Sequence, residues 1–581
     1  MNYRESLQEA IDVEIKSLEE SLRALKLRRN ALQPISSLPS EIFAAIFSAS
    51  CLPRIPSSGG KPARTRTRLR ISHVCHQWRE IALNQPLLWS HINFDTVSSA
   101  GATEILARAK SVPFYMETRD ARFGLFLEEV QARLPHIRYL SIGSEYFEAL
   151  YHELATLVSP APTLEYLSLC CQENENMRYT LIIRVLDGLF GGSTPRLSYL
   201  KLRNCNINWN SPLFKGLKYL KIVTPNKMTR PTLAVWLDAL DKIPQLKTLT
   251  LHSASPVAVH FPFDVERTVT LPSLTHLDIL ASFPDCALAI AHLILPALTS
   301  LCLAEVDHYP RNSGRVQEFL PYVVRHFHGP QDIRPLQSVL IHNRGDVNNL
   351  YLLAWSVPDI DTLVHDPPAI LGATLPTRVK LCLRGTDDDR LEVLKMVMAA
   401  LPLHGLSTLV AVDLYVDQRA GDRGHSQFWL DLLPNWPLLR RMQLAPKMLS
   451  GFILALLEDC TNLLLPSLTE LALAETTLNA DWTSCLLDVL MKRVEQGIPL
   501  ETLDLRMCHM VASNPVAVRL LNEIVTNVLH PLDFLDPENS EGEEGWSAGR
   551  RMFYEIQDLW ECLGRYPYGD GSEEENEDDD D

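Results

Sequence analysis

The sequence contains no long uninterrupted apolar segment. The longest candidate, Cys286 to Leu298, is broken by His292 and Pro296, and it falls short of the roughly 20 apolar residues that span a bilayer. The N-terminal residues are polar and charged, without the apolar core of a secretory signal peptide. Hydrophobic residues still make up 46% of the 581 residues. We therefore predict a folded protein that neither crosses a membrane nor enters the secretory pathway.

The twelve cysteines include no Cys-x-x-Cys pair. Cys170 and Cys171 are adjacent, and others, such as Cys302 and Cys382, lie within apolar segments. This distribution is typical of buried, reduced thiols, whereas disulfide frameworks belong to short secreted chains. The cysteines thus predict a reducing compartment, either the cytoplasm or the nucleus.

Patterns that support catalysis or metal binding are also missing. His152 begins a His-Glu segment, but Thr156 stands where a zinc protease needs its second histidine. Gly59, Gly60 and Lys61 lack the spaced glycines of a phosphate-binding loop. The eighteen histidines show no metal-ligand spacing with cysteines. We predict a protein that is not an enzyme and that carries neither a cofactor nor a metal.

Positive charge is in deficit, and the formal net charge is −17 at pH 7. Much of the excess lies in the C-terminal region 531–581, in Asp536 to Glu544 and in Glu573 to Asp581. Like charges in such blocks repel one another, so we predict a disordered, solubilising end, with a contact for a basic partner as the alternative. The acidity also argues against nucleic acid as the main ligand.

What the sequence does contain is most informative between Leu38 and Phe94. Pro39 suits the first position of a helix, and Glu41 complements the dipole of that first turn. Two apolar stripes at helical spacing follow, and Pro86 ends the second; they consist of Ile42, Phe43, Ile46 and Phe47, and of Val74, Trp78, Ile81 and Ala82. Two short helices cannot bury all of these side chains between themselves, so we expect apolar surface to remain for a partner.

This segment resembles the F-box family. The matching pattern is Leu38-Pro39-Ser40-Glu41-Ile42 and Ile46-Phe47, then Val74-Cys75 and Trp78-Arg79, and a closing Leu88-Trp89. The resemblance implies a three-helix module at residues 34–94 that docks on the Skp-type adaptor of a cullin-based ubiquitin ligase. It implies adaptor-binding positions, some of them partly core, at Leu38, Pro39, Glu41, Ile42, Ile46, Phe47, Val74, Cys75, Trp78, Arg79, Leu88 and Trp89.

Residues 51–70 depart from the family pattern because they form a longer segment rich in Pro, Ser, Gly and Arg. Such composition is typical of a mobile loop, and a loop there is able to displace or remodel the middle helix of the module. Five basic residues cluster in it: Lys61, Arg64, Arg66, Arg68 and Arg70. No aromatic residues are interleaved to stack on bases, so we predict a solvated loop rather than a nucleic-acid site.

Residues 1–33 predict one amphipathic helix, from Tyr3 to Gln33, ended by Pro34. Apolar residues recur every seven positions at Ile11, Leu18, Leu25 and Leu32, with Ile15 and Leu22 in the companion row. Gln8 and Arg29 interrupt that companion row. Two alternatives stay open, a homodimer through residues 7–32 and a helix packed onto its own chain.

From Pro135 onward one phrase recurs, Pro-x-Leu-x-x-Leu-x-Leu. Copies begin at Pro162, Pro195, Pro244, Pro272, Pro296 and Pro466, and degenerate forms at Pro135, Gly216, Pro335, Pro437 and Pro499. The last two leucines alternate with one outward residue, so they share one face of a short strand. The spacing of the phrases falls within the range of leucine-rich repeats.

Helical patterns separate the phrases at Leu181–Leu189, Thr232–Leu240, Cys286–Ile294 and Trp482–Glu495. Repeated units of strand and helix predict a curved array with a parallel sheet over residues 135–530, preceded by a linker and the start of the array at residues 95–134. The phrase fades at residues 307–427, which predicts either insertions within the array or a separate subdomain.

The predicted fold is therefore α/β, with an N-terminal amphipathic helix, a helical F-box module and an irregular leucine-rich-repeat solenoid. This combination resembles the leucine-rich-repeat class of F-box proteins, and more specifically the expanded F-box families of mushroom-forming fungi. In such arrays the outward strand residues form a concave binding face. Candidate positions on it are Ser168, Lys201, Lys221, Thr250, Asp278 and Asp504.

The resemblance implies the substrate-recognition subunit of an SCF-type E3 ubiquitin ligase. The F-box would bind a Skp-type adaptor and, through it, a cullin, while the repeats would bind an unknown protein substrate. The alternative function is a leucine-rich-repeat interaction scaffold without ligase association.

Overall fold

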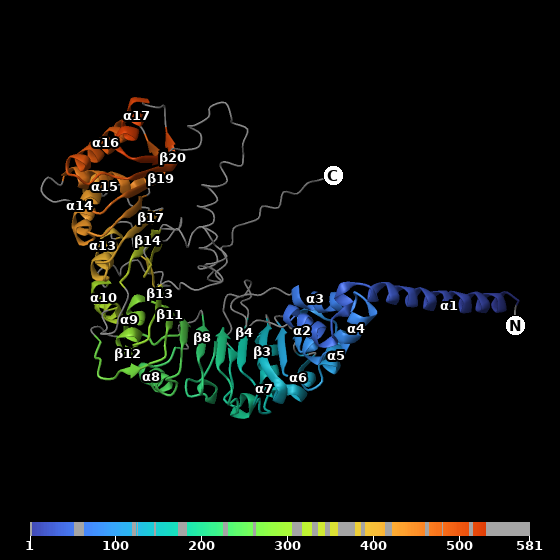
Figure 1. Ribbon diagram of the computed structural model, residues 1–581. Coiled ribbons are helices and arrows are strands. Elements are labelled where there is room, and N and C mark those ends of the chain that lie inside the picture. Colours follow the sequence, from blue (N-terminus) through green and yellow to red (C-terminus); the bar gives the residue numbers. More distant parts are fainter. Residues whose placement is uncertain are drawn as a thin grey trace, which may run out of the picture. The chain divides into compact units, whose positions relative to one another are not determined.

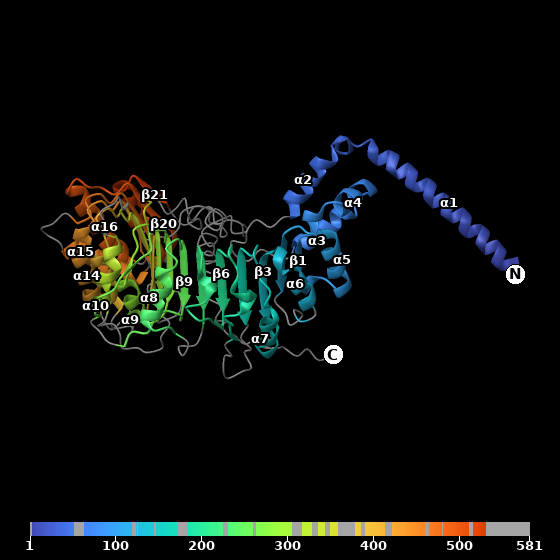
Figure 2. The ribbon, with the colours of Figure 1, turned by 90° about the horizontal axis from the view of Figure 1, so that it is seen from below.

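The computed structural model of the chain describes residues 3–51, 63–118, 124, 126–144, 147–171, 183–224, 230–259, 263–304, 316–327, 335–342, 349–357, 378–384, 390–412, 421–444, 446–458, 464–478, 480–510 and 515–529. Internal contacts divide the chain into two units, Met1–Ala254 and Ser255–Asp581. Figures 1 and 2 show both units as ribbons. Each is described by itself.

The first unit begins with helices. They are α1 (Tyr3–Ala31), η1 (Pro34–Ser37), α2 (Ser40–Cys51), α3 (Ala63–Ser72), α4 (His76–Leu83) and η2 (Pro86–Trp89). The predicted N-terminal helix is confirmed as α1, which ends two residues before the predicted Gln33. Glu41 lies in the first turn of α2, as the sequence predicts, whereas Pro39 immediately precedes the helix instead of taking its first position.

The interpretation of residues 51–70 as a loop is wrong for residues 63–70, which belong to α3. Arginine and leucine are good helix formers, and the Pro- and Gly-rich part of the segment precedes α3. Arg68 is buried, and its Nη1 donates a hydrogen bond to the carbonyl of His91. Helix α3 contacts both α2 and α4, so a middle helix exists. Residues 52–62, with Lys61, lie outside the described residues.

A parallel sheet follows in the first unit. Its strands pair in the order β1 (His91–Asn93), β2 (Phe114–Thr118), β3 (Ile137–Ser144), β4 (Tyr166–Cys171), β6 (Tyr199–Arg203), β8 (Tyr219–Val223) and β9 (Thr248–His252). Residues 95–134 thus contain β2, which pairs with β3 at the start of the array. The leucine phrase does not predict β2, because Phe114 and Met116 occupy the buried positions that leucines occupy in the other strands.

Short elements connect these strands. They are η3 (Phe94–Thr96), α5 (Ser99–Ala109), α6 (Leu127–Arg133), η5 (Leu134–His136), α7 (Phe147–Thr156), η6 (Leu189–Gly192), η7 (Pro212–Phe214) and α8 (Leu233–Asp241), with a small pairing of β5 (Ile183–Arg184) and β7 (Cys205–Asn206). The helix predicted at Leu181–Leu189 is wrong, since β5 and a turn occupy its described part. Gly188 contributes to this, because glycine disfavours helix.

The leucines of the repeated phrase form the core of the first unit. Their strand positions are buried, at Leu140, Leu167, Leu200, Leu220 and Leu249, and the preceding-turn leucines Leu164, Leu197 and Leu217 are buried as well. Asn204, at the asparagine position of the repeat, is also buried, and its Nδ2 donates to the carbonyl of Cys171 at 2.8 Å. A buried side-chain amide that pairs with a backbone group of the neighbouring repeat fixes the spacing between the two.

The second unit contains a mixed sheet. Its strands pair in the order β11 (His276–Leu280), β13 (Ser300–Ala304), β16 (Val379–Arg384), β15 (Asn349–Trp355), β14 (Ser338–His342), β17 (Thr408–Val412), β18 (Arg441–Leu444), β19 (Glu470–Leu478), β20 (Thr502–Met510) and β21 (Asn527–Leu529). Only β15 runs antiparallel to its neighbours among these pairings. The described strands within residues 307–427 therefore belong to the array and are not a separate subdomain.

The helices of the second unit are α9 (Phe283–Ala291), α10 (Val316–Val324), η10 (Arg325–Phe327), α13 (Arg390–Ala400), α14 (Gly421–Leu432), η12 (Leu433–Asn435), α15 (Pro446–Glu458), α16 (Ala480–Glu495) and α17 (Pro515–Ile524), and a short pairing joins β10 (Val269–Thr270) to β12 (Leu293–Ile294). Predicted helices at residues 232–240 and 482–495 are confirmed as α8 and α16. The one predicted at Cys286–Ile294 starts earlier, at Phe283, and ends at Ala291.

In each unit the repeat helices lie on one face of the sheet (Figure 1). We call the opposite face the helix-free face. The fold is thus a helical N-terminal region followed by α/β repeats of the leucine-rich-repeat kind, as predicted. Across the described residues, no helix combines the length and the apolar character needed to span a bilayer.

Candidate functional site

The core of the helical N-terminal module is a cluster of three aromatic rings. Phe43 and Phe47 of α2 are buried, and their ring centroids lie 5.5 and 5.1 Å from that of Trp78 in α4. Aromatic pairs at such distances add to the free energy of area burial. The predicted stripe on α2 therefore splits, because Phe43 and Phe47 face inward while Ile42 and Ile46 stay exposed.

A second support comes from the end of the module. Leu88 and Trp89 of η2 are buried, and Trp89 Nε1 donates to the carbonyl of Ala82 at 2.8 Å. The guanidinium of Arg108, in α5, lies 4.7 Å from the centroid of the Trp89 ring. Such a cation–π contact, together with the buried ring, joins the module to the first helix of the array. Phe47, Leu88 and Trp89 are thus internal positions in the unbound chain.

Helix α4 owes its start to Cys75. The Cys75 Sγ accepts a hydrogen bond from the backbone N–H of Trp78 at 3.5 Å, so this half-buried thiol caps the helix. The cap sets the position from which Trp78 reaches the phenylalanines of α2. Arg79, the next residue, is exposed.

Five large apolar side chains from α2 to η2 stay exposed to solvent among the residues that the structure describes. They are Ile42 and Ile46 of α2, Leu69 of α3, Val74 between α3 and α4, and Leu87 of η2. Of the other predicted positions, Pro39 and Glu41 are exposed and Leu38 is half-buried. Leu69 and Leu87 were not predicted, since Leu69 lies in the arginine-rich segment and Leu87 precedes the pair that matches the family. We call these five residues the apolar docking set.

Comparison with known families agrees with this geometry. The sequence model of the F-box-like family matches residues 35–95. Residues 35–95 form an F-box-like domain. Its aromatic cluster, its cysteine cap and its buried Trp89 are therefore the framework of that domain, and the apolar docking set is the surface that this framework presents.

Two other comparisons add less. No curated protein matches the chain. Among solved structures, an internalin (inlF) from Listeria monocytogenes is similar, at 13% identity over 60% of this chain and 86% of that chain, with a TM-score of 0.21. That score is too low to indicate a shared fold by itself, whereas the strand pairing and the buried leucines define the repeats directly.

The helix-free face of the first unit carries a ladder of stacked tyrosines. The strand register places Tyr115, Tyr139, Tyr166, Tyr199 and Tyr219 side by side on β2, β3, β4, β6 and β8. Successive ring centroids lie 6.3, 4.1, 4.4 and 5.6 Å apart, and all four pairs are stacked. We call these five residues the tyrosine ladder.

Burial favours the neutral form of the three central phenols of the ladder, those of Tyr139, Tyr166 and Tyr199. Burial raises the pKa of Tyr199 to about 12, with a contribution from the neighbouring Tyr166. Burial raises the pKa of Tyr139 and Tyr166 as well. A neutral hydroxyl both donates and accepts hydrogen bonds. The ladder therefore presents aromatic edges together with neutral polar groups.

The sequence contains a signal for the ladder that the prediction missed. In four successive phrases tyrosine occupies the position just before the first strand leucine, as in Tyr139-Leu140, Tyr166-Leu167, Tyr199-Leu200 and Tyr219-Leu220. Because that position alternates with the buried leucines, all four rings must point to the helix-free face. A repeated outward aromatic is the pattern that predicts such a stack.

The predicted outward residues lie in the next row along the strands. Ser168, Lys201, Lys221 and Thr250 are neighbours in register. Ser168 and Thr250 are buried, whereas Lys201 and Lys221 are half-buried. The accessible part of this row is therefore the pair of lysines beside the tyrosine ladder.

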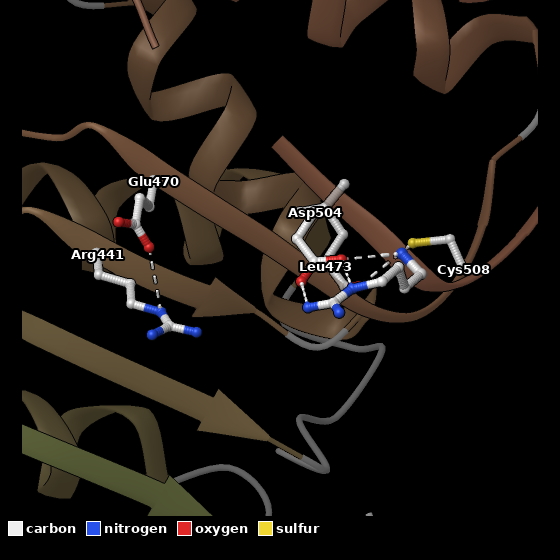
Figure 3. A network of polar contacts seen from close by, with 6 residues as sticks. Arg441, Glu470, Leu473, Asp504 and Cys508 are labelled. Carbon is white, nitrogen blue, oxygen red and sulfur yellow. Dashed lines mark hydrogen bonds and ion pairs between the residues drawn. The ribbon is translucent and has the colours of Figure 1, made fainter. Parts of the chain in front are cut away.

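In the second unit the predicted positions are Asp278 and Asp504. Asp278 is half-buried on β11, in register with Cys302. Asp504 is bound within its own strand, since its carboxylate accepts two hydrogen bonds from the Arg506 guanidinium, at 3.0 and 2.7 Å (Figure 3). Nearby, Arg441 pairs with Glu470 at 3.6 Å. Asp504 and Glu470 are thus each paired with an arginine.

No group of three or more His, Cys, Asp or Glu side chains able to hold a metal occurs in the part of the chain that the structure describes. A hollow lined by Cys205, Trp209 and Thr224 has a cavity volume of about 10 Å³, which is about the space of one water molecule and far below the roughly 300 Å³ at which ligand pockets begin.

One Gly-x-Ser-x-Gly match, from Gly545 to Gly549, lies outside the described residues. A nucleophile elbow needs a strand before that motif and a helix after it. Residues 536–544 before it are mostly acidic or small and polar, a composition that does not predict a strand. The motif therefore does not indicate a hydrolase.

Proposed function

We propose that this chain is the substrate-recognition subunit of an SCF-type E3 ubiquitin ligase. The observation that carries the proposal is the apolar docking set on the F-box-like domain. Ile42, Ile46 and Val74 keep large apolar side chains in water while an aromatic core lies directly beneath them. Exposed apolar residues over a rigid core favour a protein partner, and a Skp-type adaptor, which would bring a cullin, is the partner that F-box domains bind.

The repeats would hold the target protein. We assign target binding in the first unit to the tyrosine ladder and the adjacent Lys201 and Lys221. Tyrosine offers a large contact area with few rotatable bonds and a polar end, which is why it is enriched at the energetic centres of interfaces. Asp504 would contribute less, because its carboxylate is already paired with Arg506. Asp278 remains a candidate contact in the second unit.

The proposed mechanism needs no chemistry from this chain. Simultaneous binding of adaptor and target would raise the effective concentration of target lysines near the ubiquitin-transferring enzyme. In this role the protein is a non-catalytic receptor without a cofactor, and it acts in the cytoplasm or the nucleus. The resemblance to the F-box families of mushroom-forming fungi suggests a Skp-type adaptor from such a fungus as the first one to test.

The test is co-expression of the full chain with a Skp-type adaptor, followed by size-exclusion chromatography with mass determination. We expect a stoichiometric complex. Leu38→Ala combined with Pro39→Ala should abolish that complex and leave the repeats folded, as judged by circular dichroism. Val494→Ala on α16 is the matched control, because Val494 is also an exposed aliphatic residue but lies in the second unit.

A chain that elutes alone, with an adaptor that still binds another F-box protein, would remove the ligase proposal. The interaction scaffold would then be the remaining function. Binding that survives the Leu38 and Pro39 substitutions would show that the adaptor uses a different surface.

A further inference from the structure

Helix α1 has an apolar stripe that nothing in the described structure covers. Every residue from Leu7 to Arg29 is exposed, including Ile11, Ile15 and Leu18. A helix packed along its own chain would bury one of its sides. Such a packed helix was one of two alternatives that the sequence left open, and the described residues give it no support.

The charges of α1 are segregated along its length. The acidic residues of α1 lie in its first two thirds, at Glu5, Glu9, Asp12, Glu14, Glu19 and Glu20, with Arg4 and Lys16 among them. The last third is basic, with Arg23, Lys26, Arg28 and Arg29 and no acidic residue. Opposite charge at the two ends of one helix is complementary to a second copy that runs in the opposite direction.

We infer that α1 mediates a homodimer in which two copies of the helix pair antiparallel. With Leu18 opposite Leu22 of the second copy, Ile15 lies opposite Leu25 and the apolar rows of both helices meet. The two-fold axis passes between these pairs, so each contact occurs twice. This inference stands apart from the proposed ligase function, because it rests only on α1.

The flanking charges decide the direction. In this antiparallel register Asp12 lies beside Lys26 of the second copy, and Glu14 lies beside Arg28. Both attractive pairs occur twice, against a single like-charge contact between the two Glu19 residues on the axis. The charges therefore favour the antiparallel dimer.

A parallel dimer has the opposite balance. It would place Arg29 against Arg29 within the seam and Glu14 beside Glu19 on both sides. No attractive charge pair at the flanking positions of the parallel dimer compensates for these two repulsions. At those positions Ser21 faces Lys26, and Arg28 faces Gln33. In the antiparallel dimer Arg29 instead meets Ile11, against which its aliphatic stem can pack.

The first experiment is sedimentation equilibrium of the full chain without any partner. We expect a mass of twice the 65.6 kDa of one chain. Leu18→Ala combined with Leu22→Ala should give the monomer mass and an unchanged F-box-like domain, because both side chains are exposed in the single chain. A wild-type monomer at micromolar concentration, or a dimer that survives this double substitution, would overturn the inference.

The second experiment tests the direction with charge reversals. One variant carries Asp12→Lys and Glu14→Lys, and the other carries Lys26→Glu and Arg28→Glu. Each variant alone should lose the dimer, since all its flanking pairs become repulsive, and an equal mixture of the two should recover a heterodimer. In a parallel dimer the first variant would bind itself more tightly, because Glu14→Lys turns its contact with Glu19 attractive. Such tightening would refute the antiparallel arrangement.

Discussion

Replacing both Ile42 and Ile46 by alanine should weaken adaptor binding about 10- to 150-fold without unfolding the chain. Their exposed fractions are 46% and 44%, which together amount to nearly one whole isoleucine side chain. Complete burial of one such side chain contributes about 1.5–3 kcal/mol. Since 1.4 kcal/mol corresponds to a tenfold change in a dissociation constant, that range gives the expected loss.

Titration calorimetry of the purified chain with a Skp-type adaptor measures the effect directly. Val494→Ala, on a residue that is 45% exposed, is the control and should leave the dissociation constant unchanged. Thermal denaturation should show that both proteins are destabilised by no more than about 0.5 kcal/mol, as surface substitutions usually are. A double variant that binds as tightly as the control would show that α2 does not face the adaptor, and the assignment of the apolar docking set would fail.

The remaining predictions concern stability and the tyrosine ladder. Phe43→Ala should lower the free energy of unfolding of the first unit by about 3–5 kcal/mol, because it leaves a cavity next to Trp78. Chemical denaturation measures this loss. A loss as small as that of Ile42→Ala would contradict the prediction. Arg493→Met should lower the free energy of unfolding by about 2–4 kcal/mol. The buried guanidinium donates hydrogen bonds to the carbonyls of Leu464, Leu465 and Leu468, and these carbonyls would lose their partner. An unchanged unfolding free energy in chemical denaturation would show that those hydrogen bonds do not stabilise the fold. For the ladder, the folded-state pKa of Tyr199, about 12, lies above the unfolded value of about 10. Its stabilising contribution should therefore hold below pH 10 and be lost as the pH rises through 12, and tyrosinate absorbance that appears fully at pH 10 in the folded chain would refute this. Tyr219→Ala should reduce recovery of target proteins from cells with the ligase arrested, with little loss of stability; equal recovery by wild type and variant in quantitative mass spectrometry would remove the ladder from target binding.

The repeats could be predicted because their signal is local. Each phrase carries its own two strand leucines, and burial of Leu167 and Leu169, or of Leu200 and Leu202, needs only the alternation of a strand. The reversed strand β15 could not be predicted in the same way. It lacks the proline phrase, and its place between β14 and β16 is set by pairing with strands distant in sequence.

The helical module shows a different limit. Ile42, Phe43, Ile46 and Phe47 make a stripe that is broad enough to face either way, and the spacing alone does not say which half is buried. The choice is made by Trp78, which lies on another helix and contacts the two phenylalanines. Helix α3 was missed for a local reason, because the Pro- and Gly-rich residues before it were taken together with the helix-forming residues 63–70. The tertiary contacts of Trp78 thus decide what the pattern of α2 leaves open, whereas α3 needed only a different division of the segment.

The tyrosine ladder has a local sequence signal, but the distances between its rings are set by the packing of neighbouring strands. These distances distinguish tyrosines that stabilise the sheet from tyrosines that are available to a bound protein. The central rings, Tyr139, Tyr166 and Tyr199, lie 4.1 and 4.4 Å apart, while the terminal pairs are 6.3 and 5.6 Å apart. Close stacking gives the central rings most of their contact with one another, so their loss would mainly destabilise neighbouring strands. Tyr219 at one end is 39% exposed and lies beside Lys221. The end of the ladder, rather than its tightly stacked centre, is therefore where a bound protein gains the most new contact area.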